Sequence, residues 1–151
     1  MNKAEDVHQA LQLRGIEQSL PLALLQAREV AMAKFRPMLR KHDLTEQQWR
    51  VIRVLAAFPD IDASEIVKRS FLLAPSLTRI LQYLESQNLV KRLSDSSDMR
   101  RAYFSLTVKG KRLYQRVAPD SERIYQQIPG TSGQANLTSL CDMLEAFIDL
   151  N

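Results

Sequence analysis

Few residues in this chain of 151 residues could carry out a reaction, and they do not form a catalytic set. Histidine occurs only at His8 and His42, and cysteine only at Cys141. None of them pair at the spacing of metal ligands, and no glycine-rich phosphate loop is present. We therefore expect a protein that is not an enzyme, that holds no metal and no cofactor, and whose chemistry is binding.

The side chains best suited to binding are cationic, and one segment holds most of them. Residues 64–116 contain eleven Lys and Arg against four Asp and Glu, a net charge of +7, whereas the whole chain carries only +4. The rest of the chain is therefore net negative. A basic excess confined to one segment is typical of a surface that contacts a polyanion such as DNA.

Within this segment, an amphipathic helix is predicted to follow Leu73. Its apolar residues recur at helical spacing between Leu77 and Leu84, and Pro75 suits a first helical turn. Polar residues occupy the opposite face near its start. N-terminal residues of a recognition helix reach base edges in the major groove, so this position predicts DNA contacts. The predicted contact residues are Ser76, Thr78 and Arg79.

A β-hairpin is predicted directly after that helix. Extended, apolar patterns at Val90–Leu93 and Tyr103–Leu106 flank a polar run with basic residues. Two helices followed by such a hairpin form a winged helix-turn-helix, which reads DNA with the second helix and the wing. The alternative is a surface helix and hairpin whose charges are only solvated.

The remaining helices lie toward the two ends of the chain. Residues 19–41 form an amphipathic pattern that Pro37 is expected to kink, and Thr45 with Gln48 forms a capping box that opens the next helix. Thr107 caps a later helix, which we expect to bend or restart at Pro119. The predicted fold is mainly α with a small β wing: a single domain with an extension at 1–18, a winged helix-turn-helix at 45–107, and a helical dimerisation region formed by the N- and C-terminal helices, 19–41 and 108–150.

Two apolar stripes, one in the first long helix and one in the last, exceed what a single core requires. They favour a homodimer, although a monomer could pack both stripes internally. A twofold dimer would place two recognition helices about 34 Å apart, which suits a pseudo-palindromic DNA operator. Cys141 lies on the C-terminal stripe with Leu137 and Leu144, and we expect it to be buried in apolar packing rather than redox-active.

The stretch LVKRLSDSSDMRRAYFSLTVKG, residues 89–110, resembles the MarR family of bacterial winged-helix regulators. With ALLQAREVAMAKFRPMLRKHDLTEQQWRVIRVL at 23–55, it looks most like the branch of repressors of homoprotocatechuate (4-hydroxyphenylacetate) degradation operons. The resemblance covers about residues 19–150. It implies that Asp98 braces Arg100 in the wing tip for insertion into the minor groove, with Arg101 on neighbouring phosphates.

The resemblance also implies an effector, since members of this family generally bind phenolic or aromatic acids between the dimer helices and the winged domain. Arg28, Trp49 and Arg50 are the candidate ligand-binding residues, because an aromatic wall and a guanidinium can hold an arenecarboxylate. Alternatively, Arg28 pairs with an acid such as Glu29 of a second chain, and Trp49 belongs to the core.

The function expected from these patterns is a repressor that binds a double-stranded DNA operator and is released by a small aromatic carboxylate. The alternatives are a constitutive architectural DNA-binding protein and, less favoured, an enzyme. No apolar run approaches the roughly 20 residues needed to span a bilayer, and the N-terminal residues lack the apolar stretch of a signal peptide. We therefore expect a cytoplasmic protein without a membrane partner.

Overall fold

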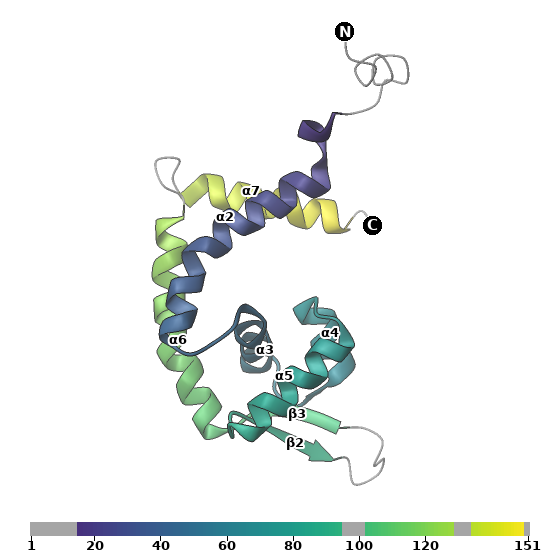
Figure 1. Cartoon of the computed structure of the whole chain (residues 1–151), viewed down its shortest axis with the longest axis vertical. Helices are drawn as coiled ribbons and strands as arrows, with labels where there is room; N and C mark the ends of the chain where they lie inside the picture. The colour runs from purple at the N-terminus through teal and green to yellow at the C-terminus, as the bar shows by residue number, and fades with distance from the viewer. Residues whose placement is uncertain (1–14, 95–101, 129–133, 150–151) are drawn as a thin grey trace. The chain divides into compact units, whose positions relative to one another are not determined.

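The computed structural model describes residues 15–94, 102–128 and 134–149, which are mostly helical (Figure 1). Backbone contacts divide the chain into two compact units, Met1–Phe35 and Arg36–Asn151. In chain order the elements are η1 (Ile16–Gln18), α2 (Leu20–Lys41), α3 (Glu46–Ala57), β1 (Ile61–Asp62), α4 (Ala63–Ser70), α5 (Ala74–Ser86), β2 (Val90–Ser94), β3 (Ala102–Leu106), α6 (Val108–Gln127) and α7 (Gln134–Asp149).

The first unit contains the short 3-10 helix η1 and most of α2. Leu20, Leu25 and Val30 of this part of α2 are 50%, 55% and 67% exposed. Large apolar side chains that remain in water lose the free energy they would gain on burial, roughly 1.5 to 3 kcal/mol each. The single chain therefore leaves several large apolar side chains of this part of α2 uncovered.

Helix α3 begins at the capping box that the sequence predicts. Gln48 N donates to Thr45 Oγ1 at 3.1 Å, and Thr45 N donates to Gln48 Oε1 at 3.0 Å. These two bonds satisfy amide groups that have no partner within the helix. Arg36 of α2 also forms an ion pair with Glu46 at 2.5 Å, which ties the end of α2 to the start of α3.

The core of the second unit forms around α3, which packs against α4, α5, α6 and β3. Val51 and Ile52 of α3 are fully buried, and so are Ile66 of α4, Leu84 of α5 and Val117 of α6. These residues come from helices whose apolar positions recur every three or four residues, so each helix turns one stripe inward. The helix-turn-helix is thus built on a single shared core.

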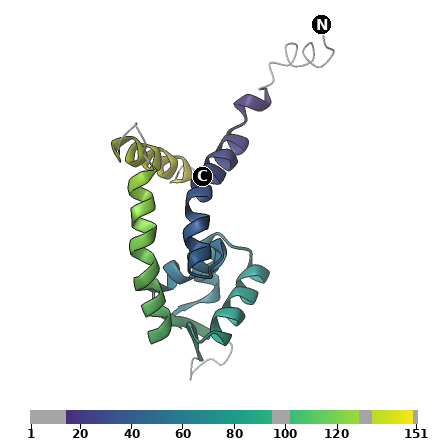
Figure 2. The same ribbon diagram turned by 60° about the vertical axis from the view of Figure 1, so that its left-hand side comes forward.

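The sheet has the order β1-β3-β2 and is antiparallel throughout. Val90 pairs with Leu106 at the base of the hairpin, and Ile61 of β1 pairs with Phe104. The predicted hairpin strands are confirmed. β3 lies between its two neighbours, and its residues Phe104 and Leu106 are buried against the helices. Both views place α5 beside this hairpin (Figures 1 and 2).

Helix α6 starts directly after β3 and ends at Gln127. Thr107 caps it as predicted, since Gly110 N donates to Thr107 Oγ1 at 3.0 Å. The expected restart at Pro119 is wrong, because α6 continues as one α-helix to Gln127. A bend there stays a prediction. Pro119 removes one backbone hydrogen bond, but Val117 and Ser121 on either side of it are buried and hold the helix in place.

Helix α7 has an apolar face that the chain leaves largely in solvent. Leu140, Phe147 and Ile148 are 46%, 46% and 60% exposed. The expectation that Cys141 is buried is wrong for the single chain, in which this residue is exposed. Burial of Cys141 therefore requires a second chain.

Of the two glycines in the described residues, Gly110 is the one at which a side chain does not fit. A Cβ there would lie 2.0 Å from the carbonyl oxygen of Leu89, a backbone atom that cannot rotate away. We predict that Gly110→Ala lowers the free energy of unfolding by about 1 to 3 kcal/mol, the usual cost of overpacking. Urea denaturation of both proteins measures this difference. Gly15→Ala is the matched control, because a Cβ at Gly15 has nothing within 4 Å, and an equal loss there would remove the explanation.

Candidate functional site

Helix α5 presents an exposed strip of polar side chains beginning at its N-terminus. Ser76, Arg79 and Tyr83 are exposed and follow one another at spacings of three and four residues. Leu77, Leu81 and Leu84 lie on the other side of the helix and are buried. The burial of one face fixes the other face outward, so Ser76 and Arg79 are placed as the sequence predicts.

Thr78 is exposed but lies on a second strip of α5, rather than in line with Ser76 and Arg79. It lines a cleft of about 470 Å³ together with Gln82 of α5 and Arg92 of β2. Its hydroxyl donates to Ala74 O at 3.1 Å, which leaves its lone pairs to accept hydrogen bonds. The sequence pattern did not separate these two strips, and it did not select Gln82 as a site residue.

The turn before α5 carries two exposed apolar side chains that the sequence analysis missed. Phe71 is 83% exposed and has a left-handed backbone (φ 52°), and Leu73 is 77% exposed. A positive φ is uncommon for a bulky residue and often occurs at functional sites. In the sequence, these two residues are only apolar residues in a turn. Such residues can be buried in a core or exposed, so the pattern did not single them out.

The wing can be described only at its base. Asp98, Arg100 and Arg101, the predicted wing-tip residues, lie outside the described residues. Lys91 and Arg92 of β2 are exposed. Arg92 lines the same cleft as Thr78 and therefore continues the polar surface of α5 onto the hairpin, whereas Lys91 lines a different cleft.

Trp49 and Arg50, the two candidate ligand-binding residues of α3, point to different neighbours. Trp49 is 6% exposed, and its ring stacks on that of Tyr114 of α6, with centroids 5.7 Å apart and planes at 24°. Arg50 Nη1 donates at 3.0 Å to the carbonyl of Ser70, the last residue of α4. Trp49 and Arg50 therefore face different helices and do not line one surface of a common binding site.

Arg53, one turn after Trp49 on α3, is a further cation that contacts α6, and the sequence analysis did not select it. It also lines one cleft beside α4 together with Arg50. Its Nη1 lies 3.4 Å from the hydroxyl oxygen of Tyr125 on α6. The indole, the guanidinium and the phenol thus line one seam between α3 and α6. The available signal was the spacing of four between Trp49 and Arg53.

Arg28, the third predicted ligand residue, lies in the first unit. Its Nη1 forms an ion pair with Glu29 Oε1 of the same chain at 2.8 Å, and both side chains are more than 40% exposed. Exposed pairs of this kind are worth little, with a median of about 0 to 1 kcal/mol. The alternative prediction is that Arg28 pairs with an acid such as Glu29 of a second chain. In the structure it pairs with Glu29 of its own chain.

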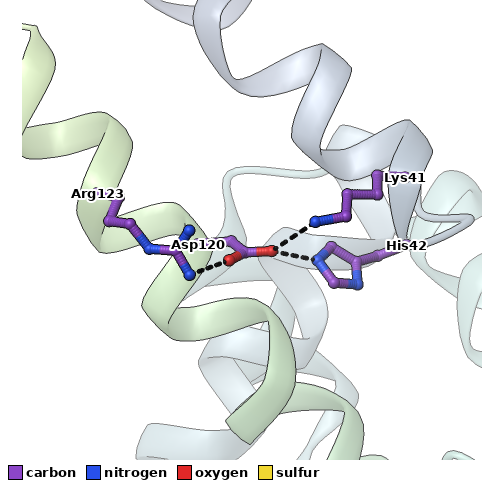
Figure 3. A network of polar contacts seen from close by, with 4 residues as sticks. All are labelled: Lys41, His42, Asp120 and Arg123. Carbon is purple, nitrogen blue, oxygen red and sulfur yellow. Dashed lines mark hydrogen bonds and ion pairs between the residues drawn. The ribbon is translucent and has the colours of Figure 1, made fainter.

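An ionic network connects the end of α2 to the middle of α6 (Figure 3). His42 Nε2 lies 2.8 Å from Asp120 Oδ2, Lys41 Nζ lies 3.7 Å from the same oxygen, and Arg123 Nη2 lies 2.6 Å from Asp120 Oδ1. The hydrogen bond with His42 is the main reason why the pKa of Asp120 lies below its ordinary value, although partial burial opposes this shift. The cluster thus holds the middle of α6 against the residues at the end of α2.

The described residues show no sign of a metal site or a membrane span. No three or more His, Cys, Asp and Glu side chains are grouped so as to hold a metal ion in this part of the chain. No helix in the described ranges is long and apolar enough to cross a bilayer.

A helix-turn-helix pair, an antiparallel wing and an exposed basic face define the class of winged-helix DNA-binding proteins. Residues 42–101 match the model of the MarR family. The chain is 46% identical over 132 residues to the homoprotocatechuate degradative operon repressor of Escherichia coli, an alignment that covers 87% of this chain and 89% of that protein. The chain belongs to the MarR family.

Two solved structures extend the comparison. The crystal structure of NadR in complex with 4-hydroxyphenylacetate is 35% identical, with a TM-score of 0.79, and the match covers 92% of this chain and 99% of NadR. The transcriptional repressor CouR bound to a 23-mer DNA duplex is 26% identical, with a TM-score of 0.80, and the match covers 88% and 94%. The predicted family and the predicted fold, mainly α with a small β wing, are confirmed.

We predict that Asp120→Asn lowers the melting temperature at neutral pH. The folded pKa of Asp120 lies below its unfolded value, so its stabilising contribution is present above the unfolded pKa and disappears as the pH falls through the folded pKa. The difference between the variant and the wild type should therefore shrink in acid. Thermal denaturation across the acid range measures it, and Glu122→Gln, an exposed position on the same helix, is the control. A difference that stays constant down to strongly acid pH would contradict the ionic role.

Proposed function

We propose that this protein is a homodimeric transcriptional repressor that binds a pseudo-palindromic DNA operator and is released from it by a small aromatic acid of a catabolic pathway. The observation that carries the proposal is the presence of two recognition surfaces on one core. An exposed polar and basic strip runs along α5, and an aromatic and cationic seam lies between α3 and α6. The relatives named above support both halves.

The DNA surface consists of the N-terminal part of α5 and the wing. Ser76, Thr78 and Arg79 read base edges, with Arg79 best suited to a bidentate contact with guanine. In the wing tip, Arg100 enters the minor groove and Asp98 braces it, while Arg101 contacts phosphate. CouR, whose fold this chain shares, is bound to a 23-mer DNA duplex in its solved structure.

The effector site is the seam between α3 and α6. Trp49 gives an aromatic wall, Arg53 gives a guanidinium for the carboxylate, and the Tyr125 hydroxyl can bind a phenol or carboxylate oxygen. Arg53 is a better anchor than the predicted Arg50, whose guanidinium already holds the end of α4. NadR, a relative, binds 4-hydroxyphenylacetate.

Arg28 enters the proposal as a contribution of the dimer helices to the same ligand. Residues 19–41 and 108–150 form the dimerisation region, and residues 1–18 form an extension, as the sequence predicts. The exposed apolar side chains of α2 and α7 support a second chain as their cover. A repressor of this kind acts on the chromosome in the cytoplasm.

The effector would act by changing the relative orientation of the two DNA-binding surfaces of the dimer. A ligand between α3 and α6 touches the winged domain through α3 and the dimerisation region through α6. A typical allosteric coupling of about 1 to 3 kcal/mol lowers operator affinity by roughly 5- to 150-fold, and operator DNA lowers ligand affinity by the same factor. A constitutive architectural protein, the alternative, would show no such coupling.

We predict that Arg79→Ala lowers affinity for the operator by about 1 to 3 kcal/mol, the usual value of a good base contact. Affinity for random DNA should fall much less. Fluorescence anisotropy with both duplexes measures the two losses, using an operator selected by the wild-type protein from random sequences. Arg116→Ala, which removes the same charge from an exposed position of α6, is the control. Equal losses on both duplexes would make Arg79 a phosphate contact.

We predict that Arg53→Ala weakens binding of 4-hydroxyphenylacetate by about 10- to 100-fold, because a hydrogen bond to a charged group is worth about 1.5 to 3 kcal/mol. Operator binding without the acid should stay nearly unchanged. Calorimetric titration measures the acid, and anisotropy measures the DNA. Arg50→Ala and Arg28→Ala test the other two cations in the same way. If Arg53→Ala binds the acid like the wild type, the seam is not the effector site.

A further inference from the structure

A second cleft lies at the base of the hairpin, between the end of α3, the strands β2 and β3, and the start of α6. Its volume is about 330 Å³, at the small end of the roughly 300 to 1,000 Å³ typical of ligand pockets. We call it the rear cleft. Its lining consists of Leu55, Ala56, Pro59, Asp60, Lys91, Ser105, Leu106, Lys111, Tyr114 and Gln115.

The rear cleft lies on the opposite side of the hairpin from the recognition helix. Neighbouring residues of a strand point to opposite faces, and the two cations of β2 follow this rule. Arg92 lines the cleft beside α5, whereas Lys91 lines the rear cleft. Lys91 is therefore directed away from the DNA-reading strip of α5, and phosphate binding in the groove does not explain it.

The rear cleft holds two ammonium groups that the rest of the described chain does not neutralise. Neither Lys91 nor Lys111 has an ion-pair partner among the described residues, and both are exposed. The one acid of the lining, Asp60, accepts a hydrogen bond from the Ser105 hydroxyl, which in turn accepts one from Asp60 N at 2.9 Å. The net charge of the lining is positive.

The remaining surface of the rear cleft is suited to an apolar body. Leu55 and Leu106 are 2% and 4% exposed and form its apolar part. Tyr114 adds an aromatic ring that also stacks on Trp49. Gln115 adds an amide that can donate a hydrogen bond to an anion. Two cations, an amide and an apolar wall together match a small molecule with one carboxylate and a compact apolar group.

We propose that the rear cleft is a second ligand site that binds a small apolar carboxylate between Lys91 and Lys111, with its apolar group against Leu55, Leu106 and Tyr114. The site shares Tyr114 with the α3–α6 seam, but neither Arg53 nor Tyr125 lines it. It does not depend on the proposed function, because it uses neither the DNA surface nor Arg53. The stacked pair of Tyr114 and Trp49 links it to the seam, so a ligand in the rear cleft biases the position of the indole.

The test uses the full-length protein carrying Arg53→Ala, in which the seam has lost its anchor, and phenylacetate as the probe. ¹⁵N NMR titration should show saturable shifts at the amides of Lys91, Ser105 and Gln115. Adding Lys111→Gln should weaken this binding by about tenfold, since a charge-assisted contact is lost. Arg112→Gln is the matched control, because it removes the same charge from the next, exposed residue of α6 and should change nothing.

Three results would overturn the proposal. One is the absence of saturable shifts at these amides. The second is an equal effect of Lys111→Gln and Arg112→Gln, which would reduce the site to general surface charge. The third is equal affinity for phenylacetamide, the neutral analogue, which would remove the role of the two lysines. Because Arg53 is already replaced, failure here leaves the effector seam untouched, and failure of the seam leaves this site standing.

Discussion

The burial of α3 is the constraint on which the rest of the second unit depends. This helix packs against α4, α5, α6 and β3, and Val51 and Ile52 at its centre have no exposed surface. Truncating one such side chain to alanine typically costs several kcal/mol, a large share of the stability of a small domain. Elements that bind DNA and elements that extend toward a dimer partner are therefore oriented by the same few apolar residues.

This shared core explains why the two recognition surfaces can be energetically linked. α5 must bury Leu77, Leu81 and Leu84 against the core, so its polar strip cannot turn without disturbing the packing around α3. On the other side, α6 meets α3 through the stacked rings of Trp49 and Tyr114 and through Arg53 and Tyr125. A change in the α3–α6 seam is thus a change at the support of the recognition helix, since packed cores shift between discrete arrangements rather than deform freely.

The sequence predicted the features that depend on local rules. The caps at Thr45 and Thr107 follow from spacing along the chain, and both are present. The restart predicted at Pro119 is absent, because local propensity says nothing of the burial of Val117 and Ser121, which supports a continuous α6. Asp98, Arg100 and Arg101 stay predictions from the resemblance, because they lie outside the described residues.

The candidate ligand residues show the limit of sequence reasoning most clearly. Trp49 and Arg50 are adjacent in sequence, yet about 100° of helical rotation separates their directions, and they meet α6 and α4 respectively. Arg53 is four residues from Trp49 and shares its face, so the spacing rule that placed the core residues also selects the anchor that we propose. No spacing rule predicts the partner of Arg53 on α6, because Tyr125 is 72 residues away in the sequence. A binding site between two helices is defined only when both faces are known, and α6, pinned to the end of α2 through Asp120, brings the second face into place.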